Sequence, residues 1–469
     1  MNDIIISVTL IFLSSALLGL ALISWRIGKR LGKVPTIIID VIFFFILVKI
    51  MLYYYLPTII RIVNNYQFVR NDNVALSDLV ILYTIELISW ALWIVAFLLT
   101  IKIFSNKKLN LNLNLNLNNF FWLNNNESKQ ILVFITSGFI IIRLFGIFNI
   151  DNNFILTLYQ SLFYYAGLTA GPFLLIISLR YFNKKIFILG IITSIIAIMS
   201  LQTRGAQVYS IIFIIFLVWF VLQNYKAKIV TISLVLVSVI SFFIFGGMAS
   251  SQLYLNESGN ISVISGVSSK GKTSKRSTFE EIGWRFGAST RMGTAFINLY
   301  ERGASAGINP IKHSLMGFLP STINPNKPNP STLVADDIYT QGMYIIYREI
   351  HGYDTYSMVE FPTGGHFYWE FGMMGVVVLS IISGIYIGLC ALYFSSLGPV
   401  AIPLMIAVFK PWGYVDPKIW VSDIIMQFYQ IILPLVLLVF ILRFKKLLFT
   451  SVKSIIRHSS MVRRDIGKV

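Results

Sequence analysis

The side chains best suited to chemistry lie close together in the sequence, at the end of a long polar segment. Glu360 opens this stretch, and His366 and Glu370 follow with a spacing of four residues. On a helix that starts near Gly365, this spacing places the two side chains on one face. Either group can take a proton from a hydroxyl, which is the role of a general base. The alternative is an interfacial histidine that caps a helix among the aromatic residues of a membrane belt.

A metal ion could bind the same pair of side chains, but the surrounding sequence does not favour one. No third ligand follows at a suitable spacing, and no H-E-x-x-H motif is present. We therefore expect no metal site here.

Three arginines are candidates for binding a phosphate group. Arg204 lies in a tight connection between two apolar runs, where Gly205 allows a ligand to approach the backbone. Arg285 and Arg291 lie in a stretch, 278–300, whose apolar residues recur at helical spacing. A guanidinium binds phosphate through two parallel hydrogen bonds and stays charged at physiological pH. The alternatives are contact with lipid phosphate for the first arginine, and a snorkelling or salt-bridged helix face for the other two.

These polar residues stand out because most of the chain is apolar. Of its 469 residues, 56% are hydrophobic and only 12% are charged, and the mean hydropathy is +0.75. A soluble domain carries about 25% charged residues, and many apolar runs here exceed the ~18 residues that mark a membrane-spanning helix. We therefore expect an all-α, polytopic membrane protein. Continuous apolar runs exclude the short alternating strands of a β-barrel.

The chain is expected to cross the membrane about 11 times, within a range of about 10 to 12. The predicted spans are residues 4–25, 35–57, 79–103, 130–149, 154–180, 186–202, 207–223, 229–247, 367–394, 398–412 and 424–443. Basic clusters fall at the same end of alternate spans, as the positive-inside rule requires. This pattern places the N-terminus outside, the C-terminus inside and the long polar loop outside.

The predicted topology divides the chain into four parts. Residues 1–247 form a membrane domain of about eight helices, and residues 248–366 form one large external loop with short amphipathic helices. Residues 367–443 complete the bundle, and residues 444–469 are a basic cytoplasmic tail. The net charge of +18 follows from this arrangement of loops and tail. Membrane lipid is therefore an expected partner, and nucleic acid is not.

Four charged residues fall inside predicted spans, where a charge is costly. They are Asp40, Lys49, Glu86 and Arg143. They could pair with one another for structural reasons or line a path for a polar substrate, and the sequence does not decide between the two. Arg61 is expected instead in an ordinary solvated loop at residues 58–78.

Several short motifs resemble those of the Wzy-type polymerases, which join polysaccharide repeat units of O-antigen or capsule. They are T-R-G at residues 203–205, L-P-x-x-I-x-P-x-K-P at residues 319–328, and the glycine- and aromatic-rich stretch at residues 362–375. The many spans and the single long, late external loop are also similar to that family.

The resemblance implies a glycosyltransferase of the GT-C type. Such an enzyme lies in the bacterial inner membrane, with its active site facing the periplasm or exterior. It transfers a growing glycan from undecaprenyl diphosphate to the terminal sugar of a new lipid-linked repeat unit, without a cofactor. Lipid-linked glycans are therefore the implied substrates, and a chain-length regulator protein is a further implied partner.

The resemblance also suggests roles for the candidate residues. The leaving group is a lipid diphosphate, so arginines near the membrane surface would stabilise its developing charge. Arg204 is the first candidate, followed by Arg291 and Arg285. The acceptor hydroxyl needs a base, and the candidates for that role are His366, then Glu360 or Glu370.

Three other functions fit the same topology. An O-antigen ligase of lipopolysaccharide synthesis shares the general plan, but the ligase pattern has a His-Asn pair that this re-entry stretch lacks. A flippase or transporter of lipid-linked sugars would show internal repeats and broken helices with polar groups near the bilayer midplane, and no repeat between halves is evident. A non-enzymatic scaffold would require no convergence of the arginines and His366.

Overall fold

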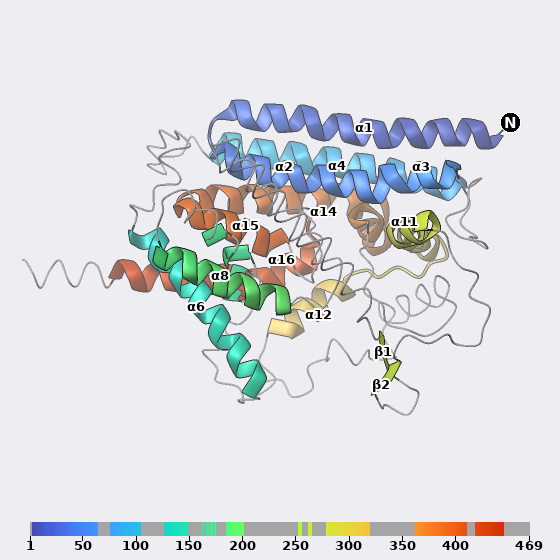
Figure 1. The fold of residues 1–469 in the computed structure, drawn as a ribbon. Coiled ribbons are helices and arrows are strands. Elements are labelled where there is room, and N and C mark those ends of the chain that lie inside the picture. The colour runs from blue at the N-terminus through green and yellow to red at the C-terminus, as the bar shows by residue number, and fades with distance from the viewer. Residues whose placement is uncertain are drawn as a thin grey trace, which may run out of the picture.

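The computed structural model describes about half of the chain, almost all of it as helix (Figure 1). The described residues are 2–63, 76–104, 126–148, 162–163, 166–167, 169–171, 173–174, 184–200, 252–255, 261–264, 278–318, 362–409 and 418–444. Strands occur in this part of the chain only as one antiparallel pair, β1 (Gln252–Leu255) with β2 (Ile261–Ile264), in which Gln252 pairs with Ile264. The helical class is confirmed at this level.

Five described helices are long and apolar enough to cross a membrane. They are Ile4–Leu31, Thr36–Val63, Ser77–Phe104, Thr363–Ser395 and Asp423–Phe444. Each one coincides with a predicted span, so a chain with several membrane-spanning helices is confirmed. The count of 11 and the large external loop stay predictions.

The other predicted spans correspond to shorter helices or lie partly or wholly outside the described residues. Residues 130–149 and 186–202 correspond to α6 (Asn126–Phe148) and α8 (Lys184–Ser200), whose apolar stretches are shorter than in the five long helices. Residues 207–223 and 229–247 lie outside the described residues, as does most of 154–180. The predicted span 398–412 corresponds to a 3-10 turn, η2 (Gly398–Val400), and α15 (Ala401–Phe409). With nine residues, α15 is about 14 Å long and cannot cross a hydrocarbon layer of about 30 Å by itself.

The second span is longer than the sequence predicts. It consists of α2 (Thr36–Ile50), a π-helical turn, η1 (Met51–Tyr55), and α3 (Leu56–Val63), which follow one another directly. Arg61 lies within α3 and is only 2% exposed. The predicted solvated loop is therefore wrong for residues 58–63, because apolar residues continue the helix and pack it against α11 (Thr278–Glu301).

The centre of the bundle is the contact between α4 (Leu76–Phe104) and α14 (Thr363–Ser395), to which α1 (Asn2–Leu31) adds an outer layer (Figure 1). Small side chains on α14 allow the two helices to approach closely. A Cβ atom at Gly384 would overlap the backbone carbonyl of Trp93. Two hydrogen bonds cross the same interface, one between the hydroxyls of Ser89 and Ser380 at 2.6 Å, and one from Trp93 Nε1 to Ser383 Oγ at 3.1 Å. Such small-residue interfaces with polar cross-links are typical of membrane helices.

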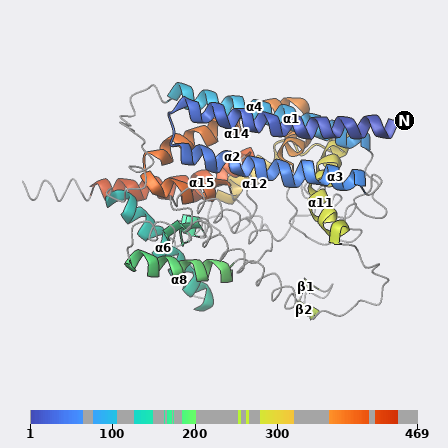
Figure 2. The same ribbon diagram turned by 45° about the horizontal axis from the view of Figure 1, so that its top comes forward.

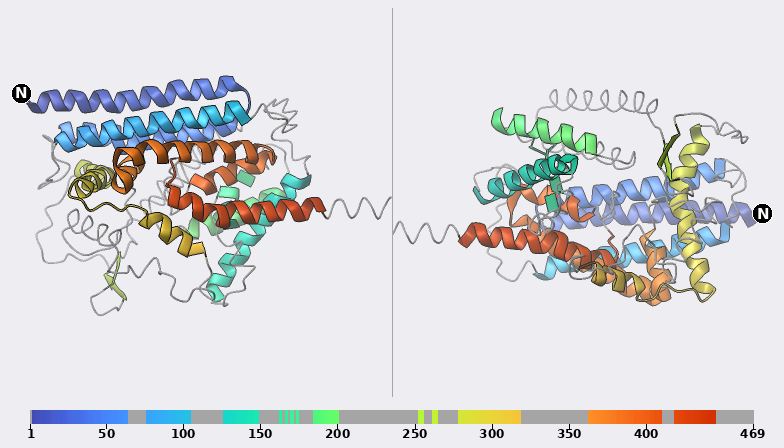
Figure 3. Two further views of the ribbon diagram at one scale, coloured as in Figure 1. Left: turned by 180° about the vertical axis from the view of Figure 1, so that it is seen from behind. Right: turned by 90° about the horizontal axis from the view of Figure 1, so that it is seen from below.

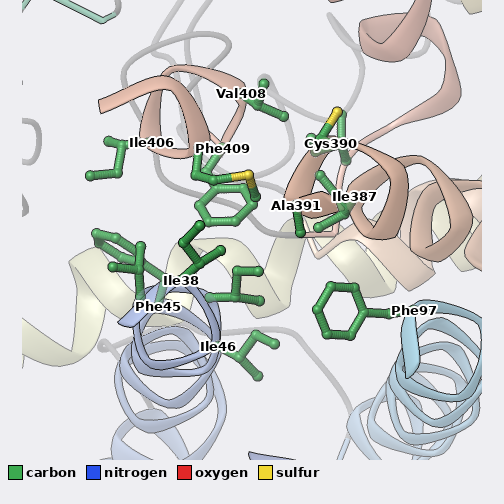
Figure 4. Close-up of a cluster of buried hydrophobic side chains, with 14 of the residues drawn as sticks. Ile38, Phe45, Ile46, Phe97, Ile387, Cys390, Ala391, Ile406, Val408 and Phe409 are labelled. Atoms are coloured by element: carbon green, nitrogen blue, oxygen red, sulfur yellow. The ribbon is translucent and has the colours of Figure 1, made fainter. Parts of the chain in front are cut away.

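An apolar core lies where α2, α4, α14 and α15 meet (Figure 4). The ring of Phe45 from α2 contacts Phe409 from α15 at a centroid distance of 6.3 Å, and Phe97 from α4 faces Ile387 and Ala391 of α14. All nine residues of α15 are buried. This short helix therefore acts as core packing inside the bundle.

Helix α11 crosses one end of the bundle at a steep angle to the long helices (Figures 2 and 3). The helix predicted at residues 278–300 is thereby confirmed. The N-terminus and α3 lie at the same end of the molecule (Figure 1), which is the end that the charge pattern predicts to be outside. From α11 the chain continues into α12 (Asn309–Phe318), which packs on α16 (Val421–Gln427). The last span continues through a π-helical turn, η3 (Phe428–Ile432), to residue 444.

The close approach at Gly384 predicts a sharp sensitivity to one added methyl group. Gly384→Ala is expected to lower the free energy of unfolding by about 1–3 kcal/mol, because the methyl group pushes α4 and α14 apart. The measurement is the thermal unfolding midpoint of the detergent-solubilised protein. Gly19→Ala is the matched control, since a Cβ atom there meets nothing within 4 Å. Equal midpoints for the two variants would contradict this account of the interface.

Candidate active site

Helix α14 is broken near its start. Phe371 (φ −141°, ψ 24°) and Gly372 (φ 63°, ψ −149°) depart from helical geometry, and they separate a half-helix, residues 363–370, from the rest of α14. The positive φ favours glycine at this position. A Cβ atom at Gly372 would also lie 2.5 Å from the hydroxyl of Tyr300 on α11. The break therefore depends on glycine for both its conformation and its packing.

The backbone groups exposed by the break have partners in the turn after α11. The N–H groups of Ala306 and Gly307 donate to the carbonyl oxygens of Trp369 and Glu370, each at 3.1 Å. The hydroxyl of Ser305 donates to the same two oxygens, at 3.2 and 2.7 Å. Within a membrane, non-helical backbone is tolerated only where such partners exist. This turn therefore stabilises the carboxyl end of the half-helix.

The amino end of the half-helix rests on a buried carboxylate from α4. Glu86 Oε1 accepts the N–H of Gly365 at 2.9 Å, and an anion at this end of a helix is favoured by the helix dipole. Glu86, rather than His366, therefore accepts a backbone N–H at the helix start. A Cβ atom at Gly364 would lie 2.7 Å from the same oxygen, so the glycine is needed for the carboxylate to approach.

The other oxygen of Glu86 forms an ion pair with Lys418, which precedes the last span. Lys418 Nζ lies 2.7 Å from Glu86 Oε2, donates to Ser89 Oγ at 3.0 Å, and lies 4.5 Å from the ring centroid of Trp90. Both charged side chains are 0% exposed. Lys49 of α2 is also 0% exposed and attracts the Glu86 carboxylate electrostatically. The buried charge of Glu86 is thus compensated from two directions.

The predicted pair of His366 and Glu370 lies on one face of the half-helix, as its spacing indicates. Nδ1 of His366 is 3.2 Å from Oε1 of Glu370, and both side chains are 0% exposed. No hydrogen bond reaches either carboxylate oxygen of Glu370 within the described part of the chain. Among the described residues, no three His, Cys, Asp or Glu side chains gather closely enough to hold a metal ion. The arrangement suits a histidine whose orientation and charge a carboxylate supports.

Aromatic rings enclose the imidazole of His366. The ring of Trp420 stacks on it at a centroid distance of 3.9 Å and an interplanar angle of 4°. The rings of Phe296 and Trp369 lie nearly perpendicular to it, with ring centroids 5.5 and 5.9 Å from the imidazole centroid. Phe296 and Trp369 are 0% exposed, whereas Trp420 is only partly buried. Trp420 is therefore the least buried of the three rings that contact the imidazole.

Arg291 reaches the same helix crossing from α11. The crossing is close because Gly293 lies against Pro362 and Gly365, with 3.3 Å between the Gly293 Cα and a Cβ atom built at Gly365. Arg291 is two residues before Gly293 and is 8% exposed, and His366 directly follows Gly365. The structure therefore brings together the two helices that carry these predicted residues, which are 75 positions apart in the sequence.

The remaining predicted site residues are only partly described. Arg285 lies in α11, and the structure does not describe its side chain. Arg204 and Glu360 lie outside the described residues. Their proposed roles stay predictions.

Most of the four charged residues predicted inside the spans interact with residues that the sequence alone does not identify. Asp40 pairs with Lys29 at 2.6 Å and accepts the N–H of Trp25 at 2.7 Å. Arg143 lies over the ring of Phe139, 5.7 Å from its centroid. Of the four, Lys49 and Glu86 attract each other, and the main partner of Glu86 is Lys418.

Sequence reasoning missed two residues of this site, Lys418 and Trp420. One signal could have found the first of them. Lys418 falls in a connection that the predicted topology places outside, where the positive-inside rule disfavours lysine. No comparable signal marks Trp420, because aromatic residues are common at membrane interfaces.

Comparison with known proteins gives no identification, since no family model, curated protein or solved structure matches this chain.

The buried ion pair predicts a large asymmetry between single and double substitutions. Lys418→Met is expected to lower the free energy of unfolding by about 3–5 kcal/mol, because it leaves the Glu86 charge buried with less compensation. The double variant Glu86→Gln/Lys418→Met is expected to recover most of that loss, since glutamine can still accept the Gly365 N–H. Thermal unfolding in detergent measures both.

Lys29→Met is the comparison for this experiment, because it breaks an ion pair whose lysine is 38% exposed and whose aspartate, 6% exposed, still accepts the N–H of Trp25. Its loss is expected to be smaller, on the order of 1 kcal/mol or less. A loss as large as that of Lys418→Met, or no recovery in the double variant, would show that the Glu86 pair has no special structural role.

Proposed function

We propose that this chain is a membrane glycosyltransferase that polymerises lipid-linked oligosaccharide repeat units. The observation that carries the proposal is the buried pair of His366 and Glu370 on the broken half-helix, at the crossing with α11, the helix that also carries Arg291, at the predicted outer end of the bundle. The sequence motifs point in the same direction. The substrates would be glycans on undecaprenyl diphosphate in the bacterial inner membrane, for O-antigen or capsule, with the active site facing the periplasm or exterior.

The three residues match the parts that such a reaction needs. The bond between the donor sugar and the lipid diphosphate breaks, and a cationic guanidinium such as that of Arg291 stabilises the departing charge. His366 accepts the proton of the attacking hydroxyl at Nε2. Glu370, whose Oε1 lies 3.2 Å from Nδ1, stabilises the positive charge of the imidazolium that forms.

Burial adds to this chemistry and also constrains it. In a site closed to water, charges interact more strongly than they do in solution. Since His366 and Glu370 are both 0% exposed, an acceptor sugar reaches them only when a covering residue moves. Binding of the lipid-linked substrate would then open the site.

A flippase for lipid-linked sugars is the second candidate, and one observation favours it. Transporters place broken helices and buried polar groups inside the membrane. Here α14 is broken at Gly372, and Glu86 and Lys418 are buried within the bundle. Glu86 lies ten residues along α4 from Leu76, which corresponds to about 15 Å of helix axis. Translocation without chain growth is therefore the outcome that any test must separate from polymerisation.

The polymerase proposal predicts a loss of chain length in cells. In a strain that lacks the gene, His366→Gln is expected to reduce polymer formation by about 100-fold or more, because the base is lost. Arg291→Ala is expected to act in the same way, because the leaving group loses its cation. The measurement is the ladder of surface polysaccharide on a gel, at matched protein levels.

Arg302→Ala is the matched control for Arg291, because Arg302 directly follows α11 and is exposed. It is expected to leave the ladder unchanged. A ladder that collapses to one exported repeat unit supports the polymerase, whereas disappearance of the single repeat unit from the outer face supports the flippase. An unchanged ladder in the His366 and Arg291 variants would remove these residues from the site.

A further inference from the structure

We propose that Trp420 is a positioning residue for His366, held in place by Lys418. The inference rests on the proposed function in one respect, since it assigns His366 a role in proton transfer. Its structural part concerns the orientation of the imidazole and stands on the contacts alone.

The residues 418–420 form a non-helical segment attached to the half-helix at two points. At the first point, Lys418 binds Glu86, whose other oxygen accepts the N–H of Gly365. At the second point, Trp420 stacks on His366, the next residue along the half-helix. Ile419, between them, is 2% exposed. The segment is therefore held near the imidazole at both ends, by Lys418 through Glu86 and by Trp420 through its stacking on His366.

The stacking has a geometry that restricts ring rotation. At 3.9 Å between centroids and 4° between planes, a turn of the imidazole about its bond to Cβ would drive its edge into the indole. Phe296 and Trp369 present their rings at 89° and 84° to the imidazole and limit the same rotation from other sides. The favoured orientation keeps Nδ1 beside Glu370.

Trp420 differs from these two rings in its attachment. Phe296 and Trp369 lie within α11 and α14, where they stack on each other at 4.7 Å and are 0% exposed. Trp420 has an extended backbone (φ −65°, ψ 144°), precedes the first residue of α16 and is only partly buried. Its position therefore depends on its stacking with His366 and on the Lys418 contacts, and not on a helix of its own.

Magnetic resonance of the histidine rings tests the structural part without relying on activity. The chain has four histidines, and His366→Gln in the labelled, detergent-solubilised protein assigns the signal of His366. A ring stacked on indole has its proton resonances shifted upfield. Trp420→Leu is expected to move the His366 resonances downfield, and Trp420→Phe, which keeps a stacking ring, is expected to restore much of the upfield shift.

Trp93→Leu is the matched control, because Trp93 is also a stacked indole, 5.3 Å from Phe97, but lies in the α4–α14 interface away from His366. It is expected to lower thermal stability and leave the His366 resonances in place. Resonances that do not move in Trp420→Leu, or that move equally in Trp93→Leu, overturn the inference.

Polymerisation kinetics with purified lipid-linked repeat units test the functional part. Trp420→Leu is expected to lower kcat about tenfold to 100-fold by misplacing the base, with KM for the donor unchanged and kcat recovered in Trp420→Phe. If the His366 resonances move while kcat does not, Trp420 is not a positioning residue for the reaction, and the polymerase proposal stands. If the wild-type protein forms no polymer, the proposed function fails, and the resonances alone decide whether Trp420 orients His366.

Discussion

The carboxylate of Glu86 is the contact on which the rest of the site depends. One oxygen accepts a hydrogen bond from the N–H of Gly365 on α14, and the other accepts a hydrogen bond from the ammonium group of Lys418. Three segments that are distant in the sequence therefore meet on a single side chain that is 0% exposed. Because an uncompensated buried charge costs several kcal/mol, these segments are stable only when they assemble together. The start of the half-helix, and with it His366, is fixed by this requirement.

The break in α14 follows from the same arrangement. A helix held at its amino end by α4 and crossed by α11 changes direction at Gly372, where a positive φ is accessible. The carbonyl groups left behind are satisfied by Ser305, Ala306 and Gly307. The carbonyl oxygens of Trp369 and Glu370 are thus satisfied by protein, which is how a membrane tolerates non-helical backbone. The result is a short helix that carries its histidine and glutamate inside the bundle.

Local patterns in the sequence predicted the parts of this site that local physics determines. The spacing of His366 and Glu370 indicated a shared helix face, and the apolar period at 278–300 indicated the helix that carries Arg291. Both features follow from helical geometry within a few residues. The extent of the second span was underestimated, because the predicted span ended at residue 57 while the helix continues through Arg61 to Val63. The structure buries that arginine against neighbouring helices.

The pairing of Glu86 with Lys418 could not be predicted in this way. The two residues are 332 positions apart, and the contact depends on how α4, α14 and the 418–420 segment pack. Stacking of Trp420 on His366 has the same origin, because it connects the region before the last span to the re-entry stretch. Single-sequence patterns describe faces of helices, whereas these contacts depend on which faces meet.

Reconstitution distinguishes chain growth from simple translocation of the repeat unit. The purified protein would be placed in liposomes with a polyprenyl diphosphate-linked repeat unit as the only glycan, and the products would be resolved by length. The account predicts glycans of two or more repeat units, together with free polyprenyl diphosphate, and neither product when His366 is replaced by glutamine. Movement of the single repeat unit across the bilayer without any longer product would contradict it.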